Sequence, residues 1–131
     1  MRKRVMLSLA VACGGALGAL CRIAGDRAVA AAMGGDFPLG ILCVNMFGSF
    51  LMGLLTGTLS RTASGGPLAS AFLGTGFLGG FTTFSSFALD TVRLFEQGHQ
   101  LFALLNIGLN VVLCVLLAGL GWMLTARREE D

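Results

Sequence analysis

The chain has 131 residues, of which 55% are hydrophobic and only 12% are charged. Soluble domains carry about 25% charged residues, so this composition excludes a soluble globular fold, and the chain is also too apolar to remain disordered. The net charge of +2 is too small to indicate a nucleic-acid partner, and the composition predicts an all-α protein that is integral to a lipid bilayer.

The first predicted span covers about residues 5–32. Its apolar run follows three basic residues at 2–4, as in a signal peptide, but it continues to Arg22 without a convincing cleavage site. We therefore expect a retained first helix. Arg22 ends the apolar core, where it either reaches the membrane interface or attracts anions into a vestibule. Gly14 and Gly18 are four residues apart, a spacing that lets helix backbones approach closely.

A second span is predicted over about residues 39–60 and contains no charged residue. Asn45 is a polar amide near its centre. A buried amide in a membrane helix either forms a hydrogen bond between helices or lines a pore as a donor, and the sequence leaves both roles open. Gly53 and Gly57 are again four residues apart, which indicates close helix packing.

The third predicted span covers about residues 67–94, and its middle, at 79–87, reads GGFTTFSSF. Glycine costs about 1 kcal/mol against alanine in a helix and threonine is stiff, whereas threonine is a good N-cap. The segment Gly79–Thr83 therefore predicts a helix broken at mid-membrane, with a second half-helix beginning near Thr82. Such a break must face protein, an ion or a water-filled path. The alternative is a glycine-rich kink that only permits packing.

The predicted half-helix carries aromatic rings and hydroxyl groups next to the break. Phe84 and Phe87 are three residues apart and share a helix face, while Ser85 and Ser86 add hydroxyl donors. The edge of an aromatic ring is positive, and so is the N-terminal end of a helix. These groups favour a small anion over a cation. Packing of the two rings against lipid or protein is the alternative.

The fourth predicted span covers about residues 101–125. Asn106 and Asn110 share one face of it, and this polar stripe either faces a pore or joins helices. Before this span, Asp90 and Arg93 are three residues apart and predict a local ion pair near the membrane boundary. The four cysteines lie inside apolar segments without a CxxC pair, so we interpret them as small packing residues.

Residues 14–22, 40–50 and 79–87 read GGALGALCR, GILCVNMFGSF and GGFTTFSSF. In the same order they resemble GGxxGAxxR, GTLxVNxxGSF and GGxTTFSTF, the signatures of the Fluc (CrcB) family of fluoride channels. The resemblance covers essentially the whole chain. It implies a passive fluoride-selective channel that exports fluoride from the cytoplasm through the cell inner membrane. It also implies an antiparallel, dual-topology homodimer with two pores.

The resemblance also implies a role for individual residues. The expected pore-lining residues are Asn45, Phe84, Ser85, Ser86 and Phe87, and Arg22 would stand in the vestibule. The backbone carbonyls of Gly79 and Thr82, from both subunits, would hold a structural sodium ion (Na⁺) at the dimer centre. Ile41 replaces a threonine of the family pattern, and the chain has no tyrosine, so the polar track of this chain differs in detail.

Two rival functions remain open at this point. A small proton-coupled anion transporter would also use a broken helix, with Asp90 as the only candidate coupling carboxylate. A non-transporting assembly subunit would use the paired glycines only for packing, and we expect no enzyme because no nucleophile–base or metal constellation is present. Six basic residues lie on the side of the termini and three on the other. This favours cytoplasmic termini and argues against fully balanced insertion.

Overall fold

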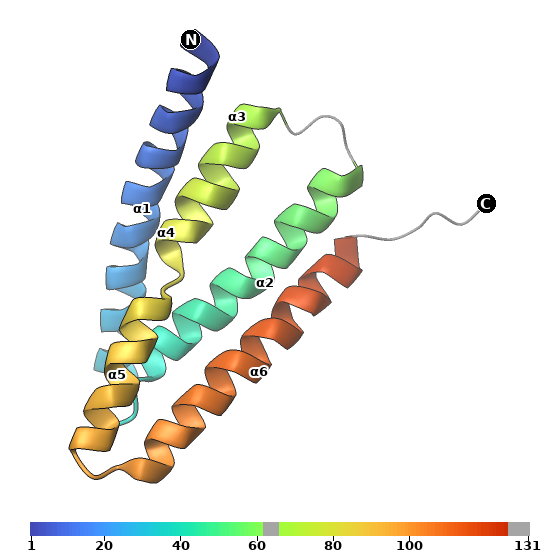
Figure 1. The fold of residues 1–131 in the computed structure, drawn as a ribbon. Helices are drawn as coiled ribbons and strands as arrows, with labels where there is room; N and C mark the ends of the chain where they lie inside the picture. Colours follow the sequence, from blue (N-terminus) through green and yellow to red (C-terminus); the bar gives the residue numbers. More distant parts are fainter. Residues whose placement is uncertain (62–65, 126–131) are drawn as a thin grey trace.

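The computed structural model describes residues 1–61 and 66–125, and within these ranges the chain is helical without any strand. The elements in chain order are α1 (Arg2–Met33), α2 (Leu39–Arg61), α3 (Pro67–Ser70), the π-helical segment η1 (Ala71–Leu78), α4 (Gly79–Phe81), α5 (Phe84–Glu96) and α6 (Gln100–Thr125) (Figure 1).

Four stretches of the described chain are long and apolar enough to cross a membrane: Arg2–Met33, Leu39–Leu59, Pro67–Glu96 and Gln100–Thr125. The prediction of an all-helical chain with four spans is therefore confirmed. Residues 62–65, between the second and third predicted spans, lie outside the described residues, and so do Arg127 and Arg128, two of the six basic residues counted on the side of the termini.

Glycines allow α1 to lie directly on η1 and α4. Gly14 and Gly18 are the buried residues of α1. A Cβ atom on Gly14 would meet the backbone carbonyl of Phe72, and one on Gly18 would meet the backbone carbonyl of Phe77. Because no side chain separates the two backbones here, the close packing predicted from the glycine spacing is confirmed.

Glycines also bring α2 into direct backbone contact with α6, and the two helices run side by side in Figure 1. A Cβ atom on Gly53 would meet the carbonyl of Ala118, and one on Gly121 would meet the carbonyl of Phe50. The Thr125 hydroxyl donates to the backbone carbonyl of Leu54 at 3.2 Å. The fold is thus two close helix pairs, α1 with the third segment and α2 with α6.

The third segment changes conformation between α4 and α5. Helix α4 includes both glycines of the predicted break and ends at Phe81, so the break predicted over Gly79–Thr83 is shorter than expected, and α5 begins at Phe84. Between them Thr82 (φ −77°, ψ 155°) and Thr83 (φ −150°, ψ 117°) have extended backbones. The Thr83 hydroxyl accepts a hydrogen bond from the backbone N–H of Ser86 at 3.1 Å, so Thr83 is the N-cap of α5. This extended pair positions the groups that form the site.

Candidate functional site

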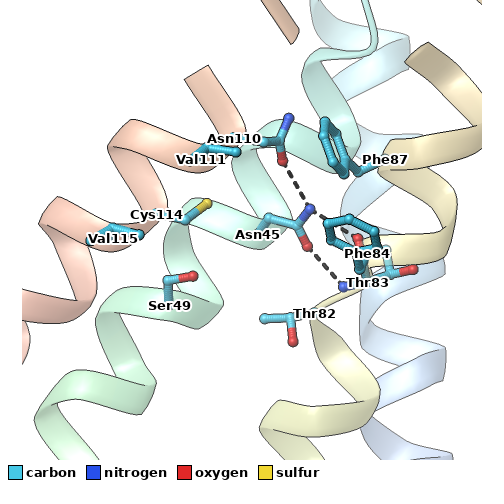
Figure 2. A pocket seen from close by; sticks show the side chains of 10 residues that line it. All are labelled: Asn45, Ser49, Thr82, Thr83, Phe84, Phe87, Asn110, Val111, Cys114 and Val115. Atoms are coloured by element: carbon cyan, nitrogen blue, oxygen red, sulfur yellow. Dashed lines mark hydrogen bonds between the residues drawn. The ribbon is translucent and has the colours of Figure 1, made fainter. Parts of the chain in front are cut away.

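An open cavity of about 340 Å³ lies where the extended pair Thr82–Thr83 faces α2 and α6. Figure 2 shows its lining, which consists of Asn45, Ser49, Thr82, Thr83, Phe84, Phe87, Asn110, Val111, Cys114 and Val115. The lining combines amides, hydroxyls, aromatic rings and aliphatic groups, and none of these side chains is a carboxylate or a basic group. It therefore places polar groups beside a solute without a full charge that would hold an anion tightly.

Asn45, on α2, binds both backbone groups of Thr83. Its Oδ1 atom accepts the Thr83 backbone N–H at 2.8 Å, and its Nδ2 atom donates to the Thr83 carbonyl at 3.0 Å. The same Nδ2 atom donates to Oδ1 of Asn110 at 3.0 Å (Figure 2). An amide nitrogen carries two hydrogens, so both hydrogens of Asn45 are used within the described chain.

Asn110 continues this polar connection along α6. Its Nδ2 atom donates to the backbone carbonyl of Asn106 at 3.0 Å and to Oδ1 of Asn106 at 2.9 Å. Asn106 donates to the Thr91 hydroxyl at 2.9 Å, and that hydroxyl donates to the Phe87 carbonyl at 2.8 Å. The stripe that the sequence left open between a pore and a helix contact thus forms buried hydrogen bonds between α6, α2 and α5.

Two of the expected pore residues, Ser85 and Ser86, lie beside the cavity without lining it. Their hydroxyl oxygens lie 3.2 Å and 3.1 Å from the Thr83 hydroxyl. The Thr83 hydroxyl has one hydrogen, which it donates to Ser86. The hydroxyl of Ser86 therefore keeps its own hydrogen for another acceptor.

The two expected ring residues lie together at the cavity. The ring centroids of Phe84 and Phe87 are 5.2 Å apart with an interplanar angle of 67°, an edge-to-face arrangement. Phe87 is 7% exposed and Phe84 is 77% exposed. The structure thus brings both rings to one site but leaves one of them uncovered on the single chain.

The carbonyls of Gly79 and Thr82 lose their usual helical partners. In a continuous α-helix each carbonyl accepts from the N–H four residues later, which here would be Thr83 and Ser86. The Thr83 N–H donates to Asn45 instead, and the Ser86 N–H donates to the Thr83 hydroxyl. Backbone carbonyls released in this way at an unwound helix are groups that bind sodium in membrane proteins.

Arg22 is not brought to this cavity by the single chain. It is half-buried on α1, and its Nε atom makes no hydrogen bond within the described residues. Asp90 and Arg93 form the predicted local ion pair at 3.5 Å, which confirms that expectation.

Two polar cavity residues were not predicted from the sequence, Ser49 on α2 and Cys114 on α6. Each lies four residues after an asparagine, Ser49 after Asn45 and Cys114 after Asn110. The helical period places residues at this spacing on one face, so the signal was present in the sequence. The thiol of Cys114 is free and half-buried.

Fold and site together define a multi-pass helical membrane protein with an uncharged cavity next to the extended residues Thr82 and Thr83. The sequence profile of the family described as "CrcB-like protein, Camphor Resistance (CrcB)" matches residues 9–122. The chain belongs to this family.

Relatives of similar length carry one common name. The chain is 42% identical over 118 residues to the "Fluoride-specific ion channel FluC" of Pseudoalteromonas translucida, with 90% of this chain and 98% of the relative covered. It is 46% identical over 120 residues to the protein of the same name from Aeromonas salmonicida, with 92% and 96% covered. For that of Ruminiclostridium cellulolyticum the identity is 41% over 122 residues, with 93% and 94% covered.

Proposed function

We propose that this protein is a passive, fluoride-selective channel that exports fluoride from the cytoplasm through the cell inner membrane. The observation that carries the proposal is the edge-to-face pair Phe84–Phe87 in a cavity with hydroxyl groups and no ionised side chain. The relatives are named as fluoride-specific ion channels, which supports fluoride as the ion.

Fluoride is small and strongly hydrated, so a pore must replace its water with closely placed donors. The hydroxyl of Ser86, which keeps its own hydrogen, and the positive N-terminal end of α5 supply such donors. The positive ring edges of Phe84 and Phe87 contribute further attraction. Because no cationic side chain lines the cavity, the ion is attracted without being trapped. Passive flow requires this balance.

We further propose an antiparallel, dual-topology homodimer in which the interruption at Thr82–Thr83 lies at mid-membrane. On the single chain the cavity is open and Phe84 is exposed, as is Gly79 at the start of α4. A second, oppositely inserted copy would cover these groups and give two equivalent pores. It would also shield the extended backbone from lipid, which an interrupted membrane helix requires.

We propose that the carbonyls of Gly79 and Thr82, which lack their helical partners, bind a structural sodium ion at the centre of this dimer. Two copies would supply four carbonyl oxygens, which suit a hard cation. The bound cation would neutralise partial negative charge where the two interruptions meet. Thr82 also lines the cavity, together with the rings of Phe84 and Phe87, so the cation would lie next to the anion path.

The proposal is tested by fluoride efflux from liposomes that contain the purified chain. We expect rapid fluoride release down its gradient and an unchanged rate when a proton gradient is imposed. Efflux that requires or follows the proton gradient would indicate the coupled transporter instead. No release above that of protein-free liposomes would contradict both.

A further inference from the structure

We propose that Asn45, Asn106 and Asn110 act together as a brace that fixes the backbone at Thr82–Thr83, and that Asn45 positions α5 rather than donating its amide to the anion. The proposal rests on the function proposed above for the identity of that anion. It changes the expected role of Asn45, which the family resemblance places in the pore lining.

The brace joins two helices, α2 and α6, to two points of the third segment. At one end Asn45 pairs with the N–H and the carbonyl of Thr83. At the other end Asn106 binds the Thr91 hydroxyl, which binds the carbonyl of Phe87. These attachment points, Thr83 and Phe87, are four residues apart and bracket the first turn of α5. The serine hydroxyls and Phe84 lie between them, so the brace determines where they stand.

All the amide hydrogens of Asn45 and Asn110 are used inside the brace. Those of Asn45 go to Thr83 and Asn110, and those of Asn110 go to the carbonyl and the Oδ1 atom of Asn106. An anion that took a hydrogen from Asn45 would leave the Thr83 carbonyl or the Asn110 Oδ1 atom without a partner.

Burial makes such an exchange unfavourable. Asn45 is 8% exposed, Asn106 is 1% exposed and Asn110 is 6% exposed. A buried acceptor that loses its hydrogen bond bears the full cost of its lost solvation, and a hydrogen-bonded network loses more than one isolated pair. The groups left for the ion at the start of α5 are therefore the Ser86 hydroxyl, which keeps its hydrogen, and the ring edges.

The sequence offers a direct test, because its three asparagines are the three members of the brace. Asparagine-selective ¹⁵N labelling of the full chain gives three side-chain NH₂ signals. On titration with sodium fluoride against sodium chloride, we expect the Asn45 signal to stay in place and its hydrogens to exchange slowly with D₂O. A saturable, fluoride-specific shift of the Asn45 signal would overturn the proposal. So would rapid exchange of the Asn45 hydrogens.

A variant away from the cavity separates positioning from ion contact. Asn106 does not line the cavity, and Asn106→Leu removes its hydrogen bonds to Thr91 and to the Asn110 amide. We expect the backbone N–H of Thr83 to exchange about two- to tenfold faster and fluoride efflux to fall. Unchanged Thr83 exchange in a folded variant would contradict the brace.

Ser49→Ala is the matched control, since Ser49 lines the same cavity one turn from Asn45 but does not contact Thr83 in the hydrogen bonds described. Thr83 exchange should be unchanged in it. If Asn106→Leu does not fold, the NH₂ signals of the unmodified chain still show whether Asn45 contacts fluoride. If the unmodified chain releases no fluoride, the proposed function fails, whereas the exchange of Thr83 and Asn45 still tests the brace.

Discussion

At the residue scale, the two rings at the cavity differ in what surrounds them. Phe87 is enclosed by the chain, whereas Phe84 is open to a partner or to an ion. The spacing of these rings was sufficient to predict that they share a face, and both line the cavity. Ser85 and Ser86 were predicted to line the pore, but their hydrogen bonds to the Thr83 hydroxyl keep them beside the cavity. The position of the Thr83 hydroxyl depends on the backbone conformation at the N-cap of α5, and residue spacing alone does not predict that conformation.

Phe84→Ile should slow fluoride efflux about fivefold. An aromatic contact contributes about 1 kcal/mol, and 1.4 kcal/mol corresponds to a factor of ten. Because Phe84 is exposed on the chain, the fold should be unaffected. Phe95→Ile is the control, since Phe95 is also exposed on α5 but does not line the cavity. Equal efflux from both variants, measured with a fluoride electrode, would remove Phe84 from the ion path.

At the element scale, the third segment is divided by hydrogen bonds that its own sequence only partly specifies. The glycines and threonines predicted a new helix start, and Thr83 caps α5. The partner that binds the extended backbone is Asn45, 38 residues earlier on α2. A tertiary contact of this kind cannot be read from a local pattern. The π-helical segment η1, on which α1 packs, was also not predicted from the sequence.

Thr83→Val should destabilise the chain by about 1 kcal/mol, the usual contribution of an N-cap. Valine has nearly the same shape but cannot accept the hydrogen bond from the Ser86 N–H. Thr83→Ser keeps that hydroxyl and should stay close to the original stability. Thermal unfolding in detergent compares the two variants. A valine variant as stable as the serine variant would show that the cap contributes little.

Gly18→Ala should destabilise the packing of α1 by about 1–3 kcal/mol, as overpacking of a close contact does. The added Cβ would meet the backbone carbonyl of Phe77 and lie 2.8 Å from the backbone nitrogen of Phe81, and backbone atoms cannot turn aside. Gly15→Ala is the matched control, because its nearest atom would be the Gly76 carbonyl oxygen at 3.8 Å. Equal unfolding temperatures for the two variants would contradict the close approach described here.

At the scale of the whole molecule, a single chain leaves much apolar surface uncovered. Large aliphatic residues of α1 and α6 are exposed, as expected for helices that face lipid, and the cavity opens on the same molecule. Composition and span length predicted the four helices, because a bilayer crossing sets both. The arrangement of a second copy depends on complementary surfaces that are not local in sequence.

The purified chain should be a homodimer, and a tag at its C-terminus should be reached from both sides of the cell membrane. Two-sided labelling is expected because the proposed antiparallel dimer needs copies in both orientations. The excess of basic residues on one side, six against three, should make the two populations unequal. Labelling from one side alone would contradict the antiparallel arrangement.

The most direct measurement is the release of fluoride and of chloride from matched liposomes that contain the same amount of this protein. We expect rapid fluoride release with chloride release close to that of protein-free liposomes, because the ring edges and hydroxyls at the interruption suit a small, strongly hydrated anion. Equal release of the two ions would contradict fluoride selectivity, and release of neither would contradict the channel itself.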